Sequence, residues 1–207
     1  KGLCNSAVGS NALACNTEGC FNSAVGQNAL AANTTADRNT AVGMSALLST
    51  TTGCCNSALG QGTLAANSTG DNNVAVGTAA LSTNTTADNN TAVGFKSLEA
   101  NTTGAGNVAV GATTGDAITT GSNNTALGFE AAGKLTTGGD NVAVGRAALL
   151  DTTTQSGNVA IGVEALENNT ADENVAIGKQ ALNANSSGSG HTAVGTSAAK
   201  ATTGAQN

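Results

Sequence analysis

One short motif returns along this chain at a fixed interval. Asn-Ser-Ala-Val-Gly occupies residues 5–9, and a related pentad begins 17 residues later, at Asn22. The interval remains 17 residues except for one step of 16, between Asn158 and Asn174. Such a period indicates a repeat architecture in which each copy packs only on its neighbours. The twelve copies begin at Asn5, Asn22, Asn39, Asn56, Asn73, Asn90, Asn107, Asn124, Asn141, Asn158, Asn174 and His191.

Several positions of the repeat are nearly invariant. With the first Asn as position 0, position 2 is always Ala, position 3 is Val, Leu or Ile, and position 4 is always Gly. Position 8 is Leu in nine of the twelve copies. A short alternating segment ending in Gly is typical of a β-strand followed by a corner with positive φ. The sequence therefore predicts an all-β fold: a parallel β-solenoid, or β-roll, of twelve 17-residue coils with two short strands per coil.

A 17-residue unit is too short to bury a face by itself, so successive coils must stack through hydrogen bonds between strands. At a spacing of about 4.8 Å, twelve coils would form a rod roughly 58 Å long. Stacking places like residues above one another, and a buried Asn amide can donate to one neighbouring coil and accept from the other. We therefore predict a structural ladder of Asn22, Asn39, Asn56, Asn73, Asn90, Asn107, Asn124, Asn141, Asn158 and Asn174.

Positions 2 and 3 point to opposite faces of the first strand. We expect the Val, Leu and Ile side chains of position 3 to fill the interior against the Leu of position 8. A face open to solvent would not require Ala in every copy, whereas close approach of a second surface would. The thin aliphatic core also favours stabilisation by association. We therefore predict inter-chain packing in a homotrimer through Ala24, Ala41, Ala58, Ala75, Ala92, Ala109, Ala126 and Ala143.

Two coils depart from the pattern in the same way. Gly115 and Ala132 replace Leu at position 8, and Ile118 and Leu135 follow three residues later. We expect the displaced aliphatic side chain still to reach the interior, because cores tolerate rearrangements that conserve volume. A bulge that binds a ligand is the alternative.

The composition excludes several classes of protein. Three Phe and no Tyr or Trp cannot build an ordinary aromatic-rich core. A net charge of −6 with seven Lys and Arg leaves no basic stripe for nucleic acid or anionic lipid. No apolar run approaches the roughly 18 residues that a membrane-spanning helix needs, so we expect no membrane insertion. Because the chain begins at Lys1 and ends within a repeat at Asn207, we expect residues 1–207 to be a single array from a longer protein.

Candidate catalytic and metal-binding residues are few. The only histidine, His191, occupies the Asn position of the last copy without a recurring carboxylate pair nearby. Asp37, Asp71 and Asp88 share a turn position, where a solvated turn is favoured over a weak Ca²⁺ site because the ligands are too few. We therefore predict no catalytic residues, no metal site, no cofactor and no enzymatic activity.

Paired threonines raise an alternative function. Pairs such as Thr34-Thr35, Thr85-Thr86 and Thr102-Thr103 recur on successive coils and resemble the arrays of ice-binding solenoids. Adjacent residues of a strand point to opposite faces, however, and a flat pair of columns would need Thr-x-Thr spacing. An ice- or glycan-binding β-solenoid that acts through a Thr- and Asn-rich face is the alternative.

All five cysteines precede residue 56, and their spacing is not that of a metal site. An odd number in an extracellular protein predicts at least one thiol that is free or paired between chains. We predict crosslinks between subunits or fibre units, with a fully reduced, packed set as the alternative. The candidate residues are Cys4, Cys15, Cys20, Cys54 and Cys55.

The repeat resembles those of tail-fibre-domain proteins from phages and bacteria, and residues 90–107 are nearly a consensus copy. More loosely, Asn158-Val159-Ala160-Ile161-Gly162 resembles the head repeats of trimeric autotransporter adhesins, which are left-handed parallel β-rolls joined as trimers. The resemblance implies a structural fibre shaft or head protein of an extracellular filament, phage tail fibre or surface adhesin, on a virion or cell surface. It implies association with itself, as a homotrimer or an end-to-end filament, and attachment to a surface glycan or host receptor.

Overall fold

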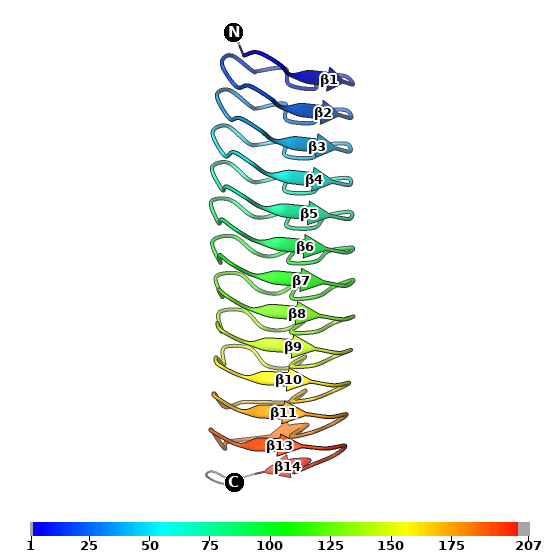
Figure 1. Ribbon diagram of the computed structural model, residues 1–207, viewed down its shortest axis with the longest axis vertical. Helices are drawn as coiled ribbons and strands as arrows, with labels where there is room; N and C mark the ends of the chain where they lie inside the picture. The colour runs from blue at the N-terminus through cyan, green and yellow to red at the C-terminus, as the bar shows by residue number, and fades with distance from the viewer. Residues whose placement is uncertain (1, 203–207) are drawn as a thin grey trace.

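The computed structural model describes residues 2–202 and shows a parallel β-solenoid without helices in that range. Figure 1 shows the coils stacked along one axis, with the strands at the front running left to right while the chain descends, so that the solenoid is left-handed. The two ends of the expected array, Lys1 and residues 203–207, lie outside the described residues. The long sheet contains β1 (Ser6–Val8), β2 (Ser23–Val25), β3 (Thr40–Val42), β4 (Ser57–Leu59), β5 (Val74–Val76), β6 (Thr91–Val93), β7 (Val108–Val110), β8 (Thr125–Leu127), β9 (Val142–Val144), β10 (Val159–Ile161), β11 (Val175–Ile177) and β13 (Thr192–Val194).

Every strand of this sheet pairs in parallel with the equivalent strand of the next coil. Ala24 lies opposite Ala41, for example, and Ala41 opposite Ala58. The 16-residue step does not disturb the register, because Val159 still pairs with Val175. The predicted in-register stack of 17-residue units is therefore confirmed.

The prediction of two strands per coil is wrong. Each coil contains one three-residue strand, and the only other strands of residues 2–202 are β12 (Ala184–Asn185) and β14 (Ala201–Thr202), which pair with each other. The Leu of position 8 lies in a turn with left-handed backbone geometry, as in Leu30 with a φ of 50°. Coils are nevertheless bonded there, since the Leu30 amide donates to the Ala46 carbonyl at 3.0 Å. Hydrogen bonds between coils thus continue beyond the strands.

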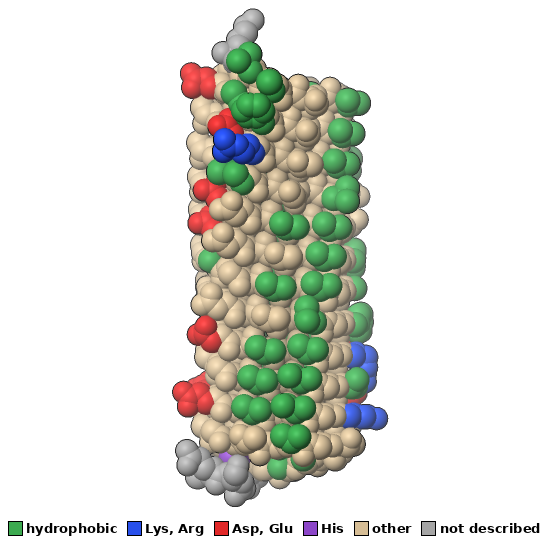
Figure 2. All heavy atoms as spheres, in the orientation of Figure 1, with side chains coloured by type: hydrophobic (Ala, Val, Ile, Leu, Met, Phe, Trp, Pro, Cys, Tyr) green, Lys and Arg blue, Asp and Glu red, His purple; other side chains and the backbone are tan. Residues whose placement is uncertain are grey.

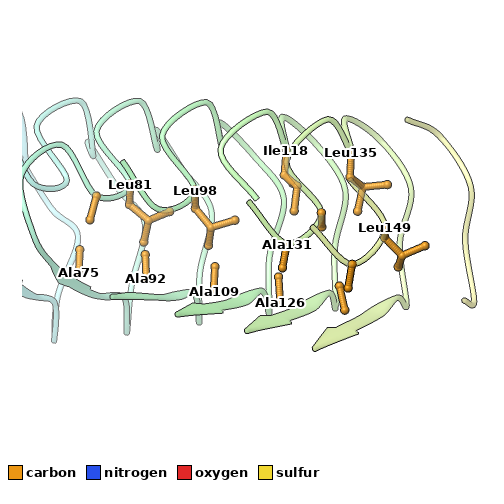
Figure 3. Packing of buried hydrophobic residues seen from close by; sticks show 14 of the residues in the cluster. Ala75, Leu81, Ala92, Leu98, Ala109, Ile118, Ala126, Ala131, Leu135 and Leu149 are labelled. Carbon is orange, nitrogen blue, oxygen red and sulfur yellow. The ribbon is translucent and has the colours of Figure 1, made fainter. Parts of the chain in front are cut away.

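The expected inside and outside of the strand are reversed. Position 2 points into the coil and is fully buried at Ala24 and Ala41, whereas position 3 is exposed, by 42% at Val25 and 51% at Leu59. Figure 3 shows why: the Leu of position 8 spans the narrow interior, and only a methyl group fits between it and the strand, as at Leu98 and Ala109. The predicted inter-chain packing is therefore wrong for Ala24, Ala41, Ala58, Ala75, Ala92, Ala109, Ala126 and Ala143, which are buried in their own chain.

The two irregular coils preserve this core by an exchange of positions. Ile118 and Leu135, at position 11, are 1% and 0% exposed. Ile118 fills the space that Gly115 leaves, since a Cβ on Gly115 would lie 3.0 Å from the Ile118 Cδ1 atom. Figure 3 shows both aliphatic side chains pointing into the interior. The interpretation of a shifted residue that still reaches the core is confirmed.

The glycine of position 4 is required for two reasons. Its φ lies between 120° and 139° in all twelve coils, in a region that L side chains rarely adopt. A Cβ at Gly94 would also overlap the carbonyl oxygen of Gly111 in the next coil. The close stacking of coils therefore depends on this column.

We expect Gly94→Ala to lower the free energy of unfolding by about 3 kcal/mol or more, because it adds both backbone strain and an overlap with the next coil. Gly62→Ala is the matched control: its φ of 65° is nearly that of Ala79 and Ala147 at the same repeat position, and no atom lies within 4 Å of the added Cβ. That control should cost less than about 1 kcal/mol. Denaturant unfolding followed by circular dichroism compares them, and equal losses would contradict the role assigned to position 4.

The exchange between positions 8 and 11 predicts a compensating pair. Leu149→Ala should cost about 2–5 kcal/mol by opening a cavity. Thr152 lies at position 11 of the same coil, is fully buried, and its hydroxyl has no hydrogen-bond partner among the described residues. Adding Thr152→Leu should therefore recover at least about 1 kcal/mol, measured as the coupling free energy of a double-mutant cycle. Additive losses in the double variant would argue against the exchange.

Candidate functional site

The predicted asparagine ladder is buried and bonds each coil to the next. The Asn39 Oδ1 atom accepts from the Asn56 backbone amide at 2.9 Å, and the Asn39 Nδ2 atom donates to the Gly53 carbonyl at 2.8 Å. The side-chain oxygen makes the equivalent bond at every step from Asn5 to His191. The ladder therefore alternates side chain and backbone, rather than running through amide side chains alone.

A second ladder, at position 11, was not anticipated. The Asn84 Nδ2 atom donates to the Asn67 Oδ1 atom at 2.9 Å and to the Ala87 carbonyl at 3.0 Å, and Asn101 repeats the arrangement. All three asparagines begin Asn-x-Ser/Thr sequons, but they are fully buried. In the folded chain their amides are engaged in the core and are not accessible for glycosylation. Recurrence of Asn at one repeat position was the signal for this ladder.

We expect Asn73→Ala to cost about 2–4 kcal/mol, because it leaves the buried Asn90 amide without its acceptor and removes one of the two hydrogen bonds to the Ala87 carbonyl. The neighbouring Asn72→Ala is the control, since Asn72 is exposed and its φ of 57° is shared by Arg38 at the same repeat position. The control should lose less than about 1 kcal/mol. Thermal and denaturant unfolding provide the comparison, and a harmless Asn73→Ala would show that the ladder is dispensable.

The turn aspartates act as hydrogen-bond acceptors for the preceding coil. Asp37, Asp71 and Asp88 each accept from a backbone amide, at 2.6 to 2.7 Å. His191 occupies the ladder position and is 2% exposed, and its backbone amide donates to Asn174. Within residues 2–202, no group of three or more His, Cys, Asp or Glu side chains could hold a metal ion. The three aspartates therefore have an identifiable structural role, whereas His191 joins the ladder through its backbone amide and its buried ring nitrogens have no hydrogen-bond partner among the described residues.

The paired threonines divide their roles, as adjacent residues were expected to do. At position 12 the hydroxyl donates to the next coil, as from Thr85 to the Thr102 carbonyl at 3.0 Å. Position 13 is an exposed Thr on eight successive coils. A single outward threonine column results, instead of the two that Thr-x-Thr spacing would give. Its members are Thr35, Thr52, Thr69, Thr86, Thr103, Thr120, Thr137 and Thr154.

All five cysteines are free thiols. Cys20 and Cys54 share one repeat position two coils apart, a separation of roughly 9.6 Å that exceeds the reach of a disulfide. A hydrogen bond with Cys55 raises the pKa of the Cys54 thiol to about 11. Because the thiolate is the reactive form, this shift slows disulfide formation at Cys54. Cys4 and Cys15 are the most exposed of the five, and bonds between chains stay a prediction for all five cysteines.

The outward side of the long sheet is the main candidate interaction surface. We call it the sheet face and define it as positions 1 and 3 of the twelve strands. Figure 2 shows two rows of apolar side chains on it, one continuous and one interrupted. The interrupted row becomes apolar where position 1 is Val, at Val74, Val108, Val142, Val159 and Val175. The continuous row is Val8, Val25, Val42, Leu59, Val76, Val93, Val110, Leu127, Val144, Ile161, Ile177 and Val194.

Charged side chains border the sheet face. Figure 2 shows acidic groups along the edge where the strands begin, with one basic group among them in the upper part, and basic groups on the lower part of the edge where the strands end. Lys96, Arg146 and Lys179 lie just after strands, and the side chain of Arg146 is 54% exposed although it contacts Glu164.

Two hollows of about 240 and 260 Å³ lie among turn residues, and neither is lined by an aromatic side chain.

Comparison with protein-family models, curated proteins and solved structures finds no match to this chain. Within residues 2–202 the structure contains no helix with the length and apolar character to cross a membrane.

Proposed function

We propose that this chain is a structural segment, shaft or head, of an extracellular fibre on a virion or cell surface, such as a phage tail fibre or an adhesin. The exposed aliphatic sheet face carries the proposal, because a rigid rod with one apolar side is suited to lateral association. Contiguous apolar patches longer than a few side chains mark interaction surfaces in soluble proteins. The resemblance of the repeat to tail-fibre and adhesin-head repeats supports the same role.

The partner we propose is the chain itself, as a homotrimer whose sheet faces turn toward a common axis. A face of twelve coils at about 4.8 Å, with a width of roughly 13 Å, offers roughly 750 Å² per copy. A trimer divides this area between two neighbours, so that each copy buries in total about what one partner buries in a standard interface, roughly 800 Å². A second copy has the same axial spacing, so its side chains can pack between those of the first along the whole rod. The buried alanines cannot serve this purpose, because the interior of the coil encloses them.

The test is the oligomeric state. We expect a native mass three times that of the monomer, and we expect Val110→Glu with Val144→Glu to give a monomer, because buried unpaired carboxylates are costly. Thr120→Glu with Thr137→Glu is the control on the exposed threonine column and should leave the mass unchanged. Analytical ultracentrifugation measures mass, and circular dichroism checks the fold. A monomeric parent chain at high concentration would contradict the proposal.

A further inference from the structure

The sheet face alone cannot fix how two copies align. Because its continuous row, at position 3, repeats at every coil, a slip by one coil brings equivalent side chains of that row into contact. Strand pairing and sheet packing of this regular kind are prone to slippage unless another interaction selects the register. The charges at the two edges of the face are candidates for that selection. The inference below rests on the proposed self-association.

Rotation about an axis parallel to the rods constrains which edges meet. We call the edge of the sheet face where the strands begin the strand-start edge, and the edge where they end the strand-end edge. In a ring of parallel copies whose sheet faces turn inward, the strand-end edge of one copy lies beside the strand-start edge of its neighbour. Rotation also preserves height, so that each coil meets the same coil of the neighbour. An antiparallel pair would instead bring like edges together. The relevant comparison is therefore between the two edges of a single coil.

Three coils carry a cation at the strand-end edge, and each also carries a carboxylate at the strand-start edge. In the ninth coil, Asp140 lies two residues before β9 and Arg146 two residues after it. In the eleventh, Glu173 precedes β11 by two residues and Lys179 follows it by two. The sixth coil has Asp88 and Lys96 around β6.

We propose that parallel copies of this chain align coil for coil, with the three cations at the strand-end edge of one copy facing the three carboxylates at the strand-start edge of the next. Arg146 and Lys96 can take part although Glu164 and Glu99 already contact them. A guanidinium has five donors and an ammonium three, and the two cationic side chains remain 54% and 41% exposed. Asp140 and Glu173 are also exposed.

The anions of the strand-end edge exclude slipped alignments. Glu130 and Glu164 lie on the eighth and tenth coils, whose strand-start edges contain no charged residue. A slip of one coil in one direction would place them opposite Asp140 and Glu173 and would remove all three attractive pairs. Like charges facing one another at an interface select against such partners.

The opposite slip is also disfavoured. It would pair Lys96 with Asp71, but it would leave Arg146 and Lys179 without carboxylates. It would also place Glu164 opposite Asp140. Of these three alignments, only the unshifted one forms three attractive pairs and no repulsive pair.

Charge exchange tests the proposed alignment. The cation variant carries Arg146→Glu and Lys179→Glu, and the anion variant carries Asp140→Lys and Glu173→Lys, at a repeat position where Arg38 shows that a long cation is accommodated. We expect each variant to weaken association on the order of tenfold at low salt, and less at high salt. All four substitutions in one chain should restore association, because every facing pair is again opposite in sign. Ultracentrifugation measures association, and circular dichroism checks each fold.

Spin labels provide an independent measure of alignment. With the other four cysteines changed to Ser, a label on the exposed Cys4 reports the distance between N-terminal ends. Parallel, unshifted copies should give labels well under the roughly 58 Å rod length, whereas antiparallel copies should separate them by about that length. Long distances, or failure of the fourfold exchange to restore association, would overturn the alignment while leaving the assembly itself intact. A monomeric parent chain would overturn both proposals.

Discussion

In-register stacking of one coil on the next is the interaction on which the structure depends. Each coil is bonded to its neighbours around most of its circumference: through three strand residues, through turn amides such as that of Leu30, and through the asparagine side chains of position 0. The spacing of about 4.8 Å that these bonds impose leaves no room for a side chain at position 4. It also aligns every surface residue with its equivalent, which is how isolated valines become the sheet face.

Periodicity predicted the fold, but alternation could not say which side of the strand was inside. Position 2 was expected to face a partner because it is always Ala. In the structure it faces the narrow interior instead, where the methyl group of Ala109 lies beside the larger side chain of Leu98. One signal was present in the sequence: position 1 shares the face of position 3, and it is Ser or Thr in coils such as those of Ser6, Thr40 and Thr91. Hydroxyl groups are accommodated more easily at a solvent-exposed surface than in an apolar interior, which indicates that positions 1 and 3 face outward.

Position 11 of the repeat holds a polar side chain in some coils and an apolar one in others. Position 11 supplies an amide ladder at Asn84 and Asn101, but it supplies core volume at Ile118 and Leu135 when position 8 is small. Sequence comparison between coils showed the displaced aliphatic residue, because it appeared at a constant distance. Asn also recurs at position 11, but that recurrence did not reveal a ladder, because a buried Asn and an exposed Asn look alike without the geometry of the turn.

The single short coil identifies where this rod tolerates change in length. Residues 158–173 lack the exposed position 13, so that Ala171 follows Thr170 directly, and the Asn169 amide reaches the Ala171 carbonyl at 2.6 Å. Because β10 and β11 still pair in register, the omission is absorbed entirely within the turn. A site that can lose a residue without disturbing the stack can also accept added ones. The corner at position 13 is therefore where extra loops could decorate such a rod at chosen heights, leaving its cross-section and its opposite side unaltered.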